Sequence, residues 1–347
     1  MFGWLFQSKS DRILSSTDTE DADILYAGQV DTPTRRKTIN QLDKDGFKVT
    51  DLSAGEIDKL QDQSVFYRHK MFTAGMNEEE QKKTVADLKR IENETETGFI
   101  QDPYVSWYHK DKNRTADYLE QQFSEYENVR MTQEFNDEEA FEIIEENAVV
   151  AKPSRNCCGN GVRKLQEESN LESYIEELEN DSYRLEEAID HEDVKDCRAI
   201  VLGDGEDATV LEIAARENGA GFANNLSNGG NYTDSGEIFD YEIDAALDAT
   251  EGLEVAAFDY MKTSEGEIVG LEVNSDMGTA INEEYSTEID INEEIADYIH
   301  YRTKDNFEYD SLDQDYASHL EVTQTNKSGK KPSTGMEGSM NQKAAPV

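Results

Sequence analysis

Short apolar runs alternate with helix-like segments near the start of the chain. Residues 23–27, 47–51 and 65–68 have the apolar, β-branched pattern of strands. Residues 33–44 have the spacing of a helix between the first two. Strands that alternate with helices are typical of parallel βαβ units, so residues 21–100 are expected to form a small α/β domain.

The same patterns continue through the rest of the chain. They predict strands and a hairpin interspersed with helices, up to about residue 300. The predicted helices are at residues 113–122, 137–147, 237–249 and 291–301, and the predicted strands are at 148–153, 198–203 and 207–216.

Two strand-like segments, 255–262 and 267–274, flank the dipeptide Glu265-Gly266 and predict a β-hairpin. A two-residue turn would pair Ser264 with Glu267 and place Asp259 directly opposite Glu272. Asn274 would share the face of Glu272, because side chains alternate along a strand.

The hairpin would therefore bring together Asp259, Glu272 and Asn274. Two carboxylates and an amide oxygen are ligands that Mg²⁺ accepts. A half-buried hairpin with a polar outer face would show the same pattern, so at this point both interpretations stay open.

The charge of the chain excludes one class of partner. It has 77 acidic and 33 basic residues, a net charge of −44, and would repel the phosphates of nucleic acids. Yet 36% of its residues are hydrophobic, which is enough for folded cores under an acidic surface. Concentrated salt screens such self-repulsion, so we expect a cytoplasmic protein of a high-salt organism. No apolar run reaches the length of a membrane span, and Cys157, Cys158 and Cys197 form no metal-binding spacing.

A few basic residues stand out in so acidic a chain. Lys152 ends a predicted strand and precedes a loop with Gly159 and Gly161, where backbone N–H groups could approach a phosphate. Lys112 begins a predicted helix. An ordinary turn would have the same composition as this loop, and each cation could instead form a surface salt bridge. Arg198, Arg216 and Asn225 are further candidates, and the lysines and arginines together predict a locally basic cleft.

Taken in order, these residues resemble the ATP-grasp enzymes, and among them the RimK-like carboxylate–amine ligases. The resemblance runs from about residue 23 to residue 299, and is weaker over the first domain. It rests on Lys112, Lys152 with its loop, Arg198, Asn225 with Gly229-Gly230, Asp259 and Glu272-Val273-Asn274.

The resemblance implies an ATP-grasp fold of the α+β and α/β type, in which two lobes enclose ATP. A small N-terminal α/β domain would span residues 21–105. The lobe with the phosphate loop would span 106–185, and the lobe with the metal site 186–305. Residues 1–20 are predicted to be a flexible leader and residues 321–347 a disordered tail.

The resemblance also implies a reaction in which ATP converts a carboxylate to an acyl phosphate and an amine then displaces phosphate. The amine donor would be an amino acid such as glutamate, and the carboxylate acceptor a peptide, a protein or a metabolite. Asp259, Glu272 and Asn274 would bind Mg²⁺, with Mn²⁺ as an alternative. Arg198, Arg216 and Asn225 would be catalytic, and ATP would be bound by Lys112, Lys152, Gly159, Gly161, Glu187 and Ile189.

One alternative function stays open. Ala223 and Asn228 stand where the family often has arginines, a departure that affects the substrate more than the use of ATP. A catalytically inactive nucleotide-binding protein with a regulatory or assembly role would share the other motifs. The sequence also leaves a homo-oligomer open.

Overall fold

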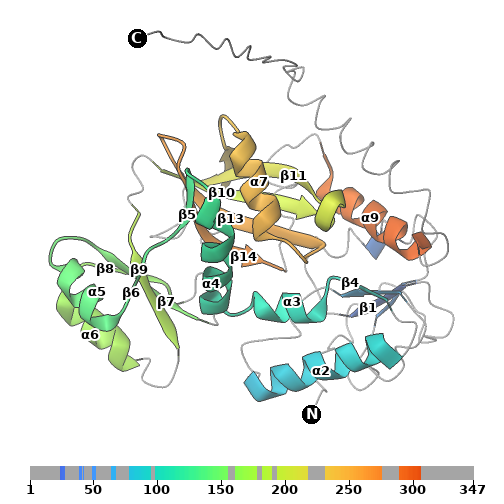
Figure 1. Ribbon diagram of the computed structural model, residues 1–347, viewed down its shortest axis with the longest axis horizontal. Coiled ribbons are helices and arrows are strands. Elements are labelled where there is room, and N and C mark those ends of the chain that lie inside the picture. The colour runs from blue at the N-terminus through green and yellow to red at the C-terminus, as the bar shows by residue number, and fades with distance from the viewer. Residues whose placement is uncertain are drawn as a thin grey trace, which may run out of the picture.

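The computed structural model describes twelve segments of the chain, among which three β-sheets can be followed (Figure 1). No helix within these segments has the length and apolar character that crossing a bilayer requires. The predicted leader at 1–20 and tail at 321–347 lie outside the described residues. The described segments are 24–27, 39–40, 42, 49–51, 64–67, 78–94, 98–154, 161–177, 182–189, 194–217, 231–275 and 289–305.

The N-terminal sheet is parallel, as the alternation of strands and helices predicted. Helix α2 (Glu78–Glu94) connects the last two strands as a βαβ crossover. Neither α2 nor the strand after it was predicted. The helix predicted at 33–44 is described at 39, 40 and 42 and is helical there. The strands are β1 (Ile24–Ala27), β2 (Val49–Asp51), β3 (Ser64–Tyr67) and β4 (Gly98–Ile100), in the order β2-β1-β3-β4.

The central sheet has the strand order β12-β11-β10-β13-β14-β5. Neighbouring strands are antiparallel, except that β5 runs parallel to β14. The strands predicted at 198–203 and 207–216 and both strands of the hairpin are confirmed. The strands are β5 (Val129–Met131), β10 (Val194–Leu202), β11 (Thr209–Glu217), β12 (Asn231–Asp234), β13 (Val255–Thr263) and β14 (Ile268–Asn274).

Helices cover both faces of the central sheet, because its strands carry apolar side chains on both sides. On one face, α4, η2 and α7 contribute to the core around Phe258 and Tyr260. On the other, the residues of α9 pack with Ile200 and Ala257, and we call this the α9 face. These helices are α4 (Lys112–Gln122), η2 (Phe123–Glu125), α7 (Asp240–Ala249) and α9 (Ile291–Asp305). Two short helices, α3 (Pro103–Tyr108) and η3 (Gly205–Asp207), are also described.

The small sheet is antiparallel and has the order β6-β9-β7-β8. Helices α5 (Asp137–Ile144) and α6 (Glu168–Glu177) enclose a separate small core with it, and the group lies to one side of the central sheet (Figure 1). The last strand of this sheet in the sequence, β9, includes residue 185, at which a domain boundary was predicted. The strands are β6 (Glu134–Phe135), β7 (Val149–Pro153), β8 (Arg163–Leu165) and β9 (Tyr183–Glu187).

The β13–β14 hairpin pairs Asp259 with Glu272 as predicted, but its turn differs from the prediction. The backbone N–H of Thr263 donates to the carbonyl of Glu267 at 2.9 Å, so the loop has three residues, and Gly266 takes a φ of +91°. The predicted pairing of Ser264 with Glu267 is therefore wrong. An irregularity in the register, between the pair Tyr260–Gly270 and the pair Asp259–Glu272, restores the predicted opposition of the two acids.

Candidate functional site

The α9 face of the central sheet carries a group of charged and polar side chains on four adjacent strands. Asp259 on β13 lies directly opposite both Arg198 on β10 and Glu272 on β14. Asp196, which is also on β10, lies directly opposite Arg216 on the next strand, β11. We call this group the central-sheet cluster, and its members are Asp196, Arg198, Arg216, Asp259, Glu272 and Asn274.

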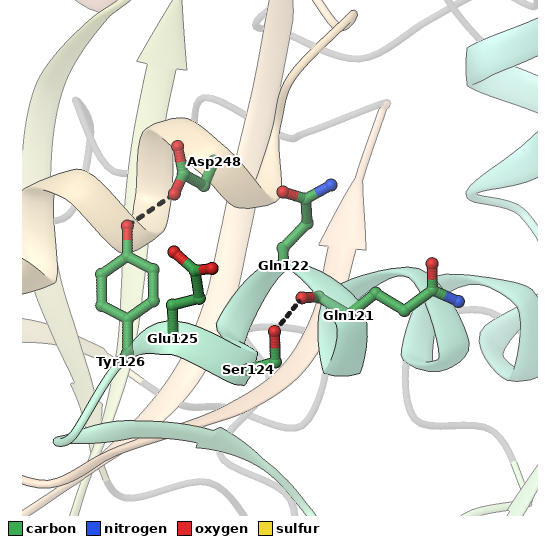
Figure 2. A pocket seen from close by; sticks show the side chains of 6 residues that line it. All are labelled: Gln121, Gln122, Ser124, Glu125, Tyr126 and Asp248. Atoms are coloured by element: carbon green, nitrogen blue, oxygen red, sulfur yellow. Dashed lines mark hydrogen bonds between the residues drawn. The ribbon is translucent and has the colours of Figure 1, made fainter.

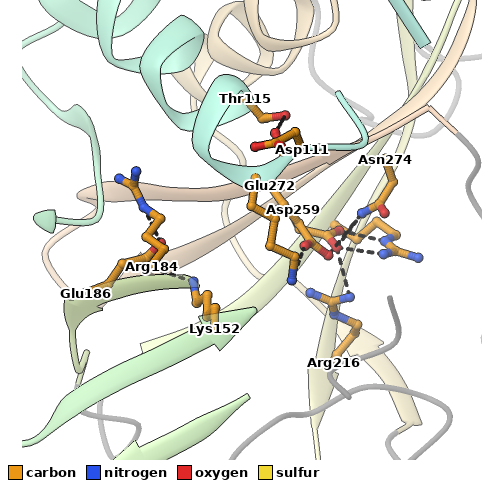
Figure 3. Close-up of polar contacts among 11 residues, drawn as sticks. Asp111, Thr115, Lys152, Arg184, Glu186, Arg216, Asp259, Glu272 and Asn274 are labelled. Carbon is orange, nitrogen blue, oxygen red and sulfur yellow. Dashed lines mark hydrogen bonds and ion pairs between the residues drawn. The ribbon is translucent and has the colours of Figure 1, made fainter. Parts of the chain in front are cut away.

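Asp259 is the hub of this cluster and is only 2% exposed (Figure 3). Arg198 donates from Nε and Nη2 to its two carboxylate oxygens, each at 2.6 Å. Arg216 donates from Nη1 to Asp259 Oδ2 at 3.3 Å and from Nε to Asp196 Oδ1 at 3.0 Å. Bidentate pairs of this kind fix the planes of both groups, so the cluster is held rigidly.

The remaining members lie at the β14 side of Asp259. Asn274 donates from Nδ2 to Asp259 Oδ2 at 2.9 Å and to Glu272 Oε1 at 3.4 Å (Figure 3). Lys112 places its Nζ 3.3 Å from Glu272 Oε2. The backbone holds this lysine at the start of α4, because Asp111 caps the helix and the N–H of Lys112 donates to the carbonyl of Ser154 at 3.0 Å. The hydrogen bond from Lys112 to Ser154 thus ties the start of α4 to the end of β7.

A second group, the small-sheet cluster, consists of Lys152, Arg184, Glu186 and Glu134. Lys152 on β7 lies directly opposite Arg184 on β9. The buried carboxylate of Glu186 accepts from both, from Lys152 Nζ and from Arg184 Nε at 2.6 Å (Figure 3). Arg184 also pairs with Glu134 at 2.5 Å. Each cation therefore has a carboxylate partner.

The two clusters influence each other electrostatically. Burial opposes ionisation of Glu272, but Lys112, Lys152 and Arg198 outweigh it and lower the pKa of its carboxyl to about 2. Lys152 belongs to the small-sheet cluster, so the two clusters face each other closely enough to interact. Burial likewise opposes the charge of Arg198, and Asp259 nevertheless raises its pKa well above the ordinary value.

The ion pairs do not form the basic cleft that was expected from the lysines and arginines. The two clusters and Lys112 contain five cations and five carboxylates, all paired with one another. The charges of these ten described side chains therefore balance, in a chain of net charge −44. Neutralisation removes most of the local repulsion that so acidic a surface would exert on an incoming anion.

The other predicted site residues lie apart from these clusters or outside the described segments. Glu187 accepts from Arg130 and from the backbone N–H of Gln133 at 2.8 Å, and Ile189 follows β9 half-buried. Gly161 has a φ of +78° and its carbonyl accepts from the hydroxyl of Tyr174 at 3.1 Å. Gly159 and Asn225 fall outside the described residues.

Four charged residues of the clusters were not predicted: Asp196, Arg184, Glu134, and Glu186 as a partner of Lys152. Asp196 precedes Arg198 by two positions, so strand alternation alone places both on one face. Arg184 and Glu186 show the same spacing on β9. The alternation of side chains along each strand could therefore have indicated that these residues share a face. The strand order was still needed to identify their partners.

The described residues also line a pocket of about 450 Å³ where α4, η2 and α7 meet. Its lining is polar: the hydroxyl of Tyr126 donates to Asp248 Oδ2 at 2.5 Å, and that of Ser124 to the carbonyl of Gln121 at 2.8 Å (Figure 2). No member of either cluster lines it. The pocket is therefore separate from the candidate site.

Comparisons with known proteins identify the fold. No protein-family model and no curated protein matches the sequence. Among solved structures, the ATP-grasp ligase PsnB complexed with minimal precursor is similar with a TM-score of 0.61 and 18% identity, over 82% of this chain and 100% of that one. The D-cycloserine synthetase DcsG has a TM-score of 0.58 and 16% identity, over 81% of this chain and 99% of that one.

A third similar structure is the macrocyclase MdnC from Microcystis aeruginosa, bound with precursor peptide MdnA. Its TM-score is 0.51 and its identity 14%, over 80% of this chain and 99% of that one. Such similarity over nearly the whole length of each neighbour establishes the fold. The chain has the ATP-grasp fold, as expected from its sequence.

Proposed function

We propose that the protein is an ATP-dependent ligase that joins a carboxylate to an amine through an acyl phosphate. The observation that carries the proposal is the direct opposition of Asp259 and Glu272 on β13 and β14, with Lys112 at 3.3 Å from Glu272. On an ATP-grasp fold, this arrangement combines two carboxylates suited to a divalent cation with an ammonium group suited to phosphate.

The donor set fits Mg²⁺. Glu272 keeps its charge far below neutral pH, and Asn274 Nδ2 lies within hydrogen-bond distance of both carboxylates, so a partly positive group already lies between them. Among the described residues, no three His, Cys, Asp or Glu side chains gather as a metal site, and Asn274 is the further polar side chain beside these two carboxylates. Asp259, Glu272 and Asn274, with its amide turned so that the oxygen takes the place of Nδ2, would hold Mg²⁺, which would supply charge neutralisation at the phosphates.

The paired cations would bind the nucleotide by exchanging partners. Lys112 and Lys152 each contact a carboxylate, and a phosphate oxygen is an equivalent anion for an ammonium group. The site would therefore trade internal ion pairs for contacts with ATP, rather than attract it by an excess of positive charge. Glu187 and Ile189 would contact the adenosine, and Gly159 and Gly161 the phosphates, as the resemblance to the family implies.

The arginines would act on the reacting acyl group. A carboxylate oxygen of the acceptor attacks the γ-phosphorus of ATP, and the bond between that phosphorus and ADP breaks. The amine nitrogen then attacks the acyl carbon, phosphate leaves with the carbon–oxygen bond electrons, and the nitrogen loses a proton. Arg198 contacts Asp259 through Nε and Nη2 and retains further N–H donors for the acyl phosphate, with Arg216 and Asn225 assisting.

The substrates belong to the proposal as well. The structures of PsnB and MdnC contain precursor peptides, which supports a peptide carboxylate as the acceptor here. An amino acid such as glutamate would be the amine donor, as in RimK-like ligases. The acidic surface supports activity in concentrated salt, because screening lowers the self-repulsion of the chain.

The test is to incubate the protein in molar potassium chloride with ATP, Mg²⁺, pooled amino acids and peptides that carry Asp and Glu. ADP and phosphate should form only when both a carboxylate and an amine are present, and mass spectrometry should show the ligated product. Glu272→Gln should lower turnover by about 100-fold or more, whereas its matched control in the hairpin loop, Glu265→Gln, should not. Nucleotide binding without turnover would contradict the proposal and favour the regulatory alternative.

A further inference from the structure

Tyr232 lies beside the central-sheet cluster and takes part in none of its hydrogen bonds. It is on β12, at the edge of the central sheet, directly opposite Arg216. Its side chain therefore lies on the same face as the arginines. The residue is only 4% exposed, and its hydroxyl is buried without a hydrogen-bond partner in the described part of the chain.

An unpaired buried hydroxyl is costly. A phenol removed from water loses its hydrogen bonds, and native proteins nearly always restore them with a protein group, a water or a ligand. The ring of Tyr232 has a structural role, because it packs in the same core as Ile200, Ala214 and Ala257. A phenylalanine would fill that role equally well, so packing does not account for the hydroxyl.

The groups around Tyr232 indicate what kind of ligand would accept a hydrogen bond from its hydroxyl. Tyr232 lies directly opposite Arg216, on the face of the sheet that also carries Arg198. Burial lowers the pKa of Arg198, but Asp259 and then Tyr232 raise it. Arg198 gives Nε and Nη2 to Asp259, and Arg216 is bound to Asp196 and Asp259. The remaining N–H groups of Arg198 and the phenolic O–H form a set of donors, which matches an anionic oxygen.

We propose that the Tyr232 hydroxyl donates a hydrogen bond to the acceptor carboxylate that Arg198 binds, and so helps to select and orient the group that becomes phosphorylated. The inference rests on the proposed ligase function. It assigns to the edge strand β12 a residue that touches the substrate, beside arginines contributed by β10 and β11. The phenol donates a hydrogen bond throughout and transfers no proton.

Tyr232→Phe tests the proposal, because the ring is kept and only the hydroxyl is lost. Hydroxylamine serves as the amine, a pool of short peptides with Asp and Glu side chains as the carboxylate, and hydroxamate formation is measured against peptide and ATP concentration. The apparent kcat/KM for the peptides should fall by about 10- to 100-fold, while the KM for ATP stays within about twofold. The urea midpoint should stay constant or rise, since an unpaired buried hydroxyl is removed.

Tyr126→Phe is the matched control. Its hydroxyl donates to Asp248 in the polar pocket away from both clusters, so its loss should lower the urea midpoint and leave hydroxamate formation unchanged. Equal rates for Tyr232→Phe and the wild type would overturn the inference alone. So would a rise in the KM for ATP with unchanged peptide dependence, because the hydroxyl would then serve the nucleotide. No hydroxamate from the wild type would overturn the ligase function itself.

Discussion

The central-sheet cluster and the small-sheet cluster are both built from ion pairs, but their lysine–glutamate pairs differ in which partner is more exposed, which is Glu272 in Lys112–Glu272 and Lys152 in Lys152–Glu186. In the central-sheet cluster the arginines are buried against Asp259, and the most accessible acid is Glu272, whose side chain is 34% exposed. In the Lys152–Glu186 pair the carboxylate is buried, and the ammonium group is the more exposed partner. The carboxylate of Glu272 thus suits a cation and the ammonium group of Lys152 an anion, and together they match a metal–nucleotide complex.

The clusters also differ in how firmly the backbone holds them. The central-sheet cluster lies on β11, β10, β13 and β14, neighbours in the middle of a six-stranded sheet, and its main pairs are directly cross-strand. The small-sheet cluster lies on shorter strands, and one of them, β6, has two residues. Charge changes in the central-sheet cluster should therefore affect stability and chemistry together, unless they fall on its exposed member.

Asp259→Asn should have the largest effect of all. The change leaves Arg198 and Arg216 buried without their shared anion, which costs about 3–5 kcal/mol of unfolding free energy. It also removes a proposed metal ligand, so turnover should fall by about 1,000-fold or more. Urea unfolding and ADP formation measure the two effects. Asp248→Asn, in the polar pocket, is the control for loss of a carboxylate, and unchanged stability of Asp259→Asn would show that Asp259 is not the hub.

Glu272→Gln should separate chemistry from stability within the same cluster. Its side chain is partly exposed and its ion pair with Lys112 spans 3.3 Å, so unfolding free energy should change by less than about 1 kcal/mol. Turnover should still fall by about 100- to 1,000-fold, because a proposed metal ligand is lost. The same two assays apply. Equal proportional losses of stability and turnover would mean that Glu272 is a structural residue.

Local patterns predicted the central-sheet cluster better than the small-sheet cluster. Asp259 and Glu272 lie within one hairpin, so alternation and the nearness of the strands were enough to place them opposite each other. The turn was predicted wrongly, because a two-residue loop was assumed where Gly266 allows three residues and an irregularity in β14 compensates. The site pairing was thus confirmed although the register near the turn was not.

The partners of the cations depend on strand order, which no local pattern reveals. Lys152 meets Glu186 only because β7 pairs with β9, across a helix and another strand in the sequence. Arg216 meets Asp196 because β10 and β11 are neighbours, and the resemblance to a family supplied the cations without pairing them with carboxylates. A locally basic cleft was therefore expected where the charges balance.

Glu186→Gln should destabilise the small-sheet cluster with a distinct pH dependence. Burial opposes ionisation of Glu186, but Lys152 and Arg184 hold the pKa of its carboxyl below the ordinary value of 4.5. The native state therefore binds this proton less readily than the unfolded state, and the stabilisation is present above pH 4.5 and lost as the pH falls below it. The variant should be about 3 kcal/mol less stable than the wild type at neutral pH.

Urea unfolding of the Glu186→Gln variant and the wild type at neutral pH, and at steps below pH 4.5, measures this difference. The two stabilities should converge on acidification. Glu134→Gln is the control, because its side chain is 47% exposed and it meets only the outer end of Arg184. A stability difference that stays constant with pH would mean that Glu186 is not held as an anion.

Gly266→Ala should have the smallest effect and tests what fixes the register at the central-sheet cluster. Gly266 has a φ of +91°, and an added Cβ would lie 2.9 Å from the hydroxyl of Tyr241, so the variant should lose about 1 kcal/mol of unfolding free energy. Gly205→Ala, with a φ of +59° and open space around the Cβ, controls for backbone strain alone. The kcat of Gly266→Ala should match the wild type, because pairing of β13 with β10 holds Asp259 in place independently of the turn. A drop in kcat larger than the loss of stability would instead show that the three-residue loop sets the opposition of Asp259 and Glu272.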